Sequence, residues 1–130
     1  MKVCIVGAGA IGGFIGTRLA AAGACEVSAL ARGATLQALH TQGWRLHMNG
    51  TLIHAPATAS DNAQALGPQD LVIIAVKGPA LESVALQLAP LLGPQTIVMP
   101  AMNGVPWWFM RGQAGESDQP LRSVDASGKI

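Results

Sequence analysis

Three glycines near the start of the chain have the spacing of a phosphate-binding turn. They form the pattern G-x-G-x-x-G within the stretch Gly7-Ala8-Gly9-Ala10-Ile11-Gly12. In such a turn the first glycine permits a tight bend, and the second lets a pyrophosphate approach the backbone. The third lets the following helix pack closely on the preceding strand, and the start of that helix attracts anions. The stretch therefore predicts a dinucleotide-binding turn.

Arg32 stands at the position that commonly distinguishes the two nicotinamide cofactors. About 20 residues past the glycines, NAD-selective sites usually place a carboxylate that binds the ribose 2′-hydroxyl. Here Ser28 to Ala31 lead directly to Arg32, and no carboxylate ends the stretch. A guanidinium can hold a 2′-phosphate through two hydrogen bonds, whereas a carboxylate would repel it. The position favours NADP over NAD; the alternative is an ordinary solvated arginine that follows a strand.

Lys77 and Asn103 follow two later apolar runs, where a ligand of an open α/β sheet would bind. Lys77 is predicted to lie near the cofactor ribose or the substrate. Asn103 both donates and accepts hydrogen bonds, which suits a ribose hydroxyl or a substrate hydroxyl and carbonyl. Alternatively, Lys77 is simply a polar residue that marks the end of its strand. Asn103 would then be a turn residue, because Asn-Gly favours turns.

Apolar periodicity predicts the elements that would position these side chains. Buried strands are expected at residues 3–6, 26–31, 70–76 and 96–102, and helices at 13–22, 34–40, 61–66 and 79–92. Strands that alternate with helices imply right-handed crossovers and a parallel sheet. The expected fold is therefore a Rossmann-type, doubly wound α/β domain with helices on both faces of a mainly parallel sheet.

Several local features refine this expectation. Ile11, Ile15 and Leu19 should share one apolar face of the first helix, and Gly12 and Gly16 should allow close approach to the sheet.

The segment between the second and third predicted strands has turn and cap signals of its own. Asn49-Gly50 separates two alternating runs, at 44–48 and 51–55, which predicts a β-hairpin. Residues 56–60 are irregular or form a short further strand, and Asp61 is the predicted cap of the brief helix that follows.

Composition excludes several classes of protein. The 130 residues suffice for one domain, half are apolar, 12% are charged and the formal net charge is +1. No basic footprint for nucleic acid or membrane is present, and no apolar run approaches the roughly 18 residues of a spanning helix. Cys4 and Cys25 lack metal-ligand spacing, as do the three histidines, so no metal site is predicted and a cytoplasmic chain with reduced thiols is expected. A secretory signal is the rejected alternative, because glycines and Arg18 interrupt its apolar core.

Taken together, these motifs resemble the N-terminal, NADP-binding part of the ketopantoate reductases (2-dehydropantoate 2-reductases). The matching stretches occur in the family's order over nearly the whole chain: residues 7–12, Leu30-Ala31-Arg32-Gly33, Ala75-Val76-Lys77, Leu91-Leu92-Gly93-Pro94 and Asn103-Gly104-Val105.

The resemblance implies a reaction and a role for each motif. Residues 7–12 would hold the pyrophosphate, Arg32 the 2′-phosphate, and Lys77 would lie along the cofactor. Asn103 would contact both the nicotinamide side and the substrate. In the family, a hydride passes from NADPH to the keto carbon of 2-dehydropantoate, giving pantoate for pantothenate and coenzyme A synthesis. A lysine of a C-terminal helical domain is the general acid there, and a glutamate of that domain binds the substrate.

The chain departs from the family pattern in two ways. Residues 1–130 would form only the cofactor-binding domain, with 112–130 its least regular part, so a truncated or single-domain form is expected that is inactive alone. No residue is assigned as catalytic, and Lys129 does not match the family lysine. The alternative function is a stand-alone dinucleotide-sensing regulatory module without catalysis.

The second departure concerns the substrate, which is expected to be a small 2-keto acid. Met102 stands where many family members have Gln, and Trp107-Trp108 follows soon after, so a 2-keto acid other than 2-dehydropantoate stays open. The two tryptophans are also expected to be covered by the absent domain or by a second copy in a homo-oligomer.

Overall fold

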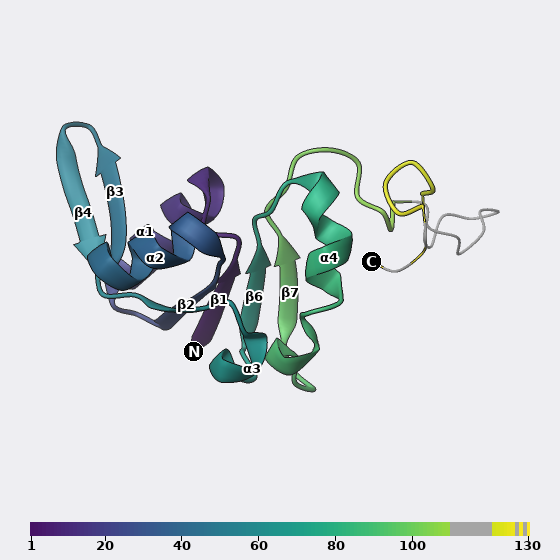
Figure 1. The fold of residues 1–130 in the computed structure, drawn as a ribbon, viewed down its shortest axis with the longest axis horizontal. Helices are drawn as coiled ribbons and strands as arrows, with labels where there is room; N and C mark the ends of the chain where they lie inside the picture. Colours follow the sequence, from purple (N-terminus) through teal and green to yellow (C-terminus); the bar gives the residue numbers. More distant parts are fainter. Residues whose placement is uncertain (110–120, 127, 129) are drawn as a thin grey trace.

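A computed structural model describes residues 1–109, 121–126, 128 and 130 (Figure 1). The elements, in chain order, are β1 (Lys2–Val6), α1 (Ala10–Ala22), β2 (Glu26–Leu30), α2 (Gly33–Gln42), β3 (Trp44–Met48), β4 (Thr51–Ala55), β5 (Thr58–Ser60), α3 (Ala63–Leu66), β6 (Leu71–Ile74), the 3₁₀ turn η1 (Gly78–Ala80), α4 (Leu81–Ala85), the 3₁₀ turn η2 (Ala89–Leu91) and β7 (Ile97–Pro100). Most of the stretch 112–130, predicted to be the least regular, lies outside the described residues.

Five strands form one parallel sheet in the order β5-β2-β1-β6-β7. The chain starts in the middle at β1, moves outward to β2 and β5, and then returns past β1 to build β6 and β7. The direction of winding therefore reverses between β1 and β6, which is where open α/β sheets bind their ligands. This order confirms the predicted doubly wound sheet.

The central strands bury side chains on both faces, as parallel strands covered by helices must. In β1, Val3 and Ile5 belong to one apolar cluster, whereas Cys4 and Val6 belong to the other. The first cluster lies under α1, α2 and the hairpin; the second lies under α3, α4 and η2 (Figure 1). Helices thus cover both faces, and the two cores hold β1 and β6 rigidly at the switch point.

Helix α1 begins three residues earlier than predicted, and its buried face is the one with glycines. Gly12, Gly16 and Thr17 are buried. Of the predicted apolar face, Ile15 and Leu19 pack against the core, whereas Ile11 is 57% exposed. Ile11 lines an open cavity beside the start of the helix instead of packing on the core. Gly16 also differs from the prediction, because it admits the ring of Trp44 rather than the sheet.

The hairpin of β3 and β4 has the predicted bounds and lies against α1. Asn49 and Gly50 have φ values of 51° and 75°, the left-handed pair that a two-residue hairpin turn requires. The next prediction was wrong by one residue. Asn62, not Asp61, caps α3, because its side-chain oxygen accepts a hydrogen bond from the Gln64 N–H at 3.0 Å.

The predicted helix over 79–92 is broken into η1, α4 and η2. Pro90 lacks an N–H and cannot sit inside a continuous helix, so it opens the separate turn η2. The segment nevertheless keeps one apolar face against the core, since Leu81, Val84, Leu88 and Leu91 are all buried.

Strand β7 is shorter than predicted and is not buried. It lies at the edge of the sheet, and its side chains Ile97, Val98 and Met99 are 65%, 41% and 43% exposed. An apolar run has the same composition in a central strand and at an uncovered edge, so the sequence did not distinguish the two cases.

Candidate functional site at the carboxyl edge of the sheet

The glycine turn between β1 and α1 has the geometry that its spacing predicts. Gly7 has a φ of +89°, and a Cβ at this position would lie 2.6 Å from Val76 Cγ1. A Cβ at Gly12 would collide with the Gly7 carbonyl oxygen, so this glycine lets α1 start close to the turn. A Cβ at Gly9 would meet nothing within 4 Å. Gly9 thus faces open space, as expected where a phosphate approaches the backbone.

The start of α1 is free to receive an anion. Gly9 is the N-cap, no side chain caps the helix and no acidic residue lies in its first turn. Gly9 and Ala10 are both exposed. The N–H groups of the first turn therefore combine with the positive end of a 13-residue helix. These are features that fit the pyrophosphate of a dinucleotide.

A cavity of about 620 Å³ opens between this helix start and the ends of β6 and β7. Gly9, Ala10 and Ile11 line one side, and Lys77 and Asn103 line the other. The walls come from both sides of the switch point, so the sheet order brings together residues that lie far apart in the sequence. Both polar side chains are exposed.

Arg32 lies on a second, smaller cavity of about 110 Å³ at the end of β2. Gly7 also lines it, so the two cavities lie on either side of the glycine turn. Backbone hydrogen bonds fix the neighbourhood: Gly7 N–H donates to the Leu30 carbonyl, and Ala31 N–H donates to the Ser60 carbonyl, each at 3.0 Å. Arg32 is exposed, and the guanidinium is thus available to a ligand.

Three predicted residues of the turn, Gly7, Ala8 and Gly12, do not line the large cavity, and Gly7 lines the small one instead. Ala8 is half-buried and packs against the cluster that contains Trp44, and Gly12 is a buried residue in the first turn of α1. Sequence reasoning also missed two residues: Asp61 and Gln87 line the small cavity beside Arg32. Gln87 follows α4, and no local pattern indicates that it would reach the end of β2.

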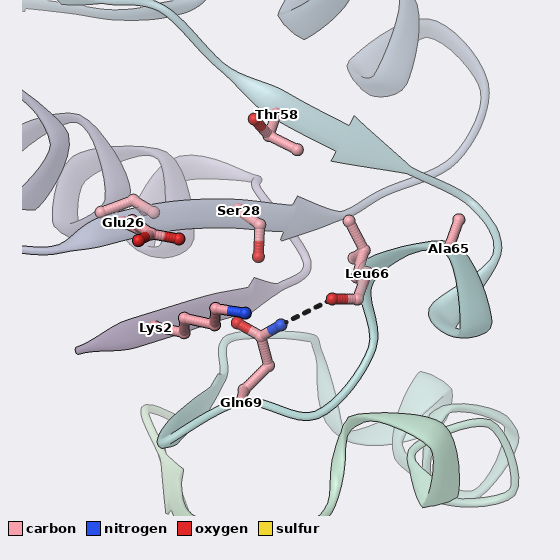
Figure 2. Close-up of a pocket in the computed structure, with 8 residues that line it drawn as sticks. Lys2, Glu26, Ser28, Thr58, Ala65, Leu66 and Gln69 are labelled. Carbon is pink, nitrogen blue, oxygen red and sulfur yellow. Dashed lines mark hydrogen bonds between the residues drawn. The ribbon is translucent and has the colours of Figure 1, made fainter.

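Another cavity, of about 310 Å³, lies at the opposite edge of the sheet, where the strands begin (Figure 2). Lys2 and Glu26 open their strands there, and Gln69 precedes β6. The side-chain amide of Gln69 donates to the Leu66 and Gly67 carbonyls at 2.9 Å, and the Ser28 hydroxyl donates to the Val3 carbonyl at 3.3 Å. Gln69 thus holds the loop before β6 in place and Ser28 links β2 to β1, so we assign this cavity no function.

The described residues contain no group of three or more His, Cys, Asp or Glu side chains that could hold a metal. In the same part of the chain, no helix is long and apolar enough to cross a membrane. The two cysteines are free, as predicted.

The sheet order and the glycine turn at its switch point define a Rossmann-type α/β domain of the dinucleotide-binding class. The family model for ketopantoate reductase PanE/ApbA matches residues 3–106. The chain therefore belongs to the ketopantoate reductase family, which consists of oxidoreductases, as the sequence resemblance indicated.

Comparison with individual proteins supports this assignment. The chain is 44% identical to the 2-dehydropantoate 2-reductase of Mesorhizobium japonicum over its whole length, and it covers 40% of that protein. A crystal structure from Ralstonia solanacearum MolK2 shares 56% identity and a TM-score of 0.92, with 98% of this chain and 40% of that chain covered. The chain thus spans about two fifths of the length of these relatives.

A further solved relative is a D-mandelate dehydrogenase in a ternary structure with NADH and anilino(oxo)acetate. It shares 27% identity and a TM-score of 0.69, with 81% of this chain and 34% of that chain covered.

Proposed function

We propose that residues 1–130 are the cofactor-binding domain of an NADPH-dependent reductase of 2-dehydropantoate or a similar 2-keto acid. The observation that carries the proposal is the 620 Å³ cavity, which places the open Gly9, Lys77 and Asn103 around one space at the switch point. The identity to a 2-dehydropantoate 2-reductase supports the substrate class. With 2-dehydropantoate as its substrate the chain would work in pantothenate synthesis; the proposed compartment is the cytoplasm, with which the free thiols Cys4 and Cys25 are consistent.

Each residue of the site has a proposed role that follows from its position. The first turn of α1 binds the pyrophosphate through backbone N–H groups, and Gly9 leaves the room for it. The Arg32 guanidinium binds the 2′-phosphate, since it lies on the other side of the glycine turn. Lys77 contributes a positive charge along the cofactor, and the Asn103 amide binds the substrate end of the same cavity.

When bound, NADPH supplies a hydride to the keto carbon; the carbonyl becomes a hydroxyl as its oxygen takes a proton, and NADP⁺ remains. The chain's own contribution to this chemistry is to position the two reactants in the cavity that Lys77 and Asn103 share. We assign the proton donor to no residue of this chain.

The choice of NADP rests on Arg32. A relative of this fold was solved with NADH, so the fold alone does not set the cofactor. In this chain the end of β2 presents a guanidinium, which favours the doubly charged 2′-phosphate by direct ion pairing, although the Asp61 carboxylate on the same cavity acts in the opposite direction.

Thermal unfolding with each cofactor tests the proposal. A ligand at 100 times its dissociation constant adds about 2.7 kcal/mol to the free energy of unfolding. We expect NADPH to raise the Tm more than NADH at equal concentration. Arg32→Ala should weaken NADPH binding by roughly tenfold or more and leave NADH binding nearly unchanged.

Arg18→Ala is the matched control, because it removes the same charge from an exposed residue that lines neither cavity. Failure of both cofactors to raise the Tm would reject the dinucleotide site. Equal losses of NADPH and NADH affinity in Arg32→Ala would reject the 2′-phosphate contact.

A further inference from the structure

The carboxyl edge of the sheet has a third pocket, of about 230 Å³, besides the large and the small cavity. It adjoins the large cavity on the side of β7. Four residues line both spaces: Gly78, Pro100, Met102 and Asn103. Asn103 therefore stands at the junction, with the glycine turn and Lys77 on one side of it and the third pocket on the other. A ligand held at Asn103 has access to both.

The walls of this third pocket are almost entirely apolar. Beyond the shared residues they consist of Leu81, Gly104, Val105, Pro106, Trp107, Trp108 and Val124. Among the described residues that line it, none has a charged side chain. Side-chain hydrogen bonding is limited to the Asn103 amide and the two indole N–H groups. The pocket is open to solvent at Val105, Trp108 and Val124, but a polar group placed against its walls finds few hydrogen-bonding partners.

The aromatic wall is held in place by the core and by the chain that returns to it. Trp107 and Met102 pack against the core cluster under α4. The two tryptophan rings lie edge to face, with their centroids 4.2 Å apart and an interplanar angle of 88°. The Leu121 N–H donates to the Trp107 carbonyl at 3.2 Å, which holds the turn that brings Val124 to the pocket. Trp108 is 39% exposed and forms the outer part of the wall.

We propose that this pocket binds the side chain of the substrate, and that the substrate is a 2-keto acid with an aryl group rather than 2-dehydropantoate. The inference rests on the proposed function and narrows it. A dry apolar cavity of about 150 Å³ suffices for benzene, so a phenyl group fits this volume. The Asn103 amide then lies at the keto acid end, where the pocket meets the cofactor cavity.

The chemistry of the walls decides between the two substrates. Tryptophan rings stack favourably on an aryl group, in addition to the apolar area that they bury. The side chain of 2-dehydropantoate ends in a hydroxyl, which finds few hydrogen-bonding partners on these apolar walls. Sites discriminate strongly against a group whose hydrogen bonds they leave unmade.

Calorimetric titration of the full chain, saturated with NADP⁺, tests the inference. The oxidised cofactor allows a keto acid to bind without turnover. Phenylglyoxylate should bind at least tenfold more tightly than 2-dehydropantoate. Trp108→Ala should weaken phenylglyoxylate by roughly tenfold and change 2-dehydropantoate little, because it removes the outer aromatic wall. Phe109→Ala is the matched control, since this neighbouring aromatic residue does not line the pocket.

A second variant tests polarity at nearly constant volume. Met102→Gln adds an amide at the junction, and it should narrow the preference for phenylglyoxylate by giving the hydroxyl of 2-dehydropantoate a partner. Equal or tighter binding of 2-dehydropantoate by the unmodified chain, or binding of neither acid, overturns the inference while NADP⁺ binding stands. Absence of NADP⁺ binding in the same titration rejects the proposed function, and the inference falls with it.

Discussion

Glycines that look equivalent in the sequence differ in what surrounds them. Gly9 faces open space and Gly12 lies against the Gly7 carbonyl, although both belong to one short pattern. The spacing predicted a different task for each, and the contacts agree with it. At this scale the sequence was informative because the constraint is local: three glycines, one turn and one helix start.

The two glycines should separate cofactor binding from stability. Gly9→Ala should cost about 1 kcal/mol or less in the free energy of unfolding, since alanine is only a poorer N-cap. It should nevertheless weaken NADPH binding, because its methyl group enters the space proposed for the pyrophosphate. Gly12→Ala should cost about 1–3 kcal/mol, since backbone atoms of the turn cannot give way. Urea unfolding and NADPH titration of both variants measure the two effects; a Gly9→Ala variant that binds NADPH normally would contradict the assignment.

The thiols of Cys4 and Cys25 should differ in reactivity. Cys4 is fully buried in β1, and burial raises the pKa of its thiol, although hydrogen bonds from Ser28 and Leu30 act in the opposite direction. Cys25 is half-buried. A thiol reagent at pH 8 should therefore modify Cys25 first, and Cys4 only after denaturant is added.

The raised pKa also predicts a pH dependence. A group whose pKa is higher in the folded than in the unfolded protein contributes stability that is fully present below its pKa in the unfolded protein. That stability is lost as the pH rises through its pKa in the folded protein. Urea midpoints measured upward from pH 8 should therefore fall in the unmodified chain more than in Cys4→Ala, relative to each protein's value at pH 7. In the thiol-reagent experiment, rapid modification of both thiols in the folded protein would contradict the burial of Cys4.

At the scale of elements, the predictions succeeded where one local signal decides the outcome. The hairpin followed from Asn49-Gly50, whose left-handed backbone angles are those that the two-residue turn requires. They failed where two neighbours compete for one role. Asp61 and Asn62 are both good cap residues, and only the backbone conformation selects Asn62.

The identity of the α3 cap can be tested with two adjacent substitutions. Asn62→Ala removes the acceptor for the Gln64 N–H and should cost about 1 kcal/mol in the free energy of unfolding. Asp61→Ala, the control, should change it by less than about 0.5 kcal/mol, as exposed substitutions usually do. Urea denaturation followed by circular dichroism measures both. A larger effect at Asp61 than at Asn62 would show that the cap is misassigned.

Over the whole molecule, the sheet is well covered in the middle and bare at one edge. The sequence predicted the doubly wound fold because alternating strands and helices leave few other arrangements. It could not predict that β7 is exposed, because apolar composition does not say which strands a fold leaves at its edge. The walls contributed by Asp61, Gln87 and Val124 were missed for a similar reason, since only tertiary packing brings them to a cavity.

Substitutions at Val72 and Val98 compare a covered strand with an exposed edge strand directly, because the two residues are register partners in β6 and β7. Val72 is fully buried, whereas Val98 is 41% exposed. Val72→Ala should cost about 2 kcal/mol in the free energy of unfolding, from lost burial and the cavity left behind. Val98→Ala should cost less than about 1 kcal/mol. Equal costs in urea unfolding would mean that β7 is covered in solution.

The strand order in the sheet also determines when, during protein synthesis, the parts of the site can come together. β1 is made before every other strand of the sheet, yet it occupies the middle, and its neighbour β6 follows only after the hairpin and β5. While the chain is still on the ribosome, the glycine turn therefore has no opposite wall until Lys77 and Asn103 emerge. Since domains fold as units during translation, the proposed cofactor could bind a nascent chain only late. Until then one edge of β1 lacks its neighbouring strand and can pair with other chains.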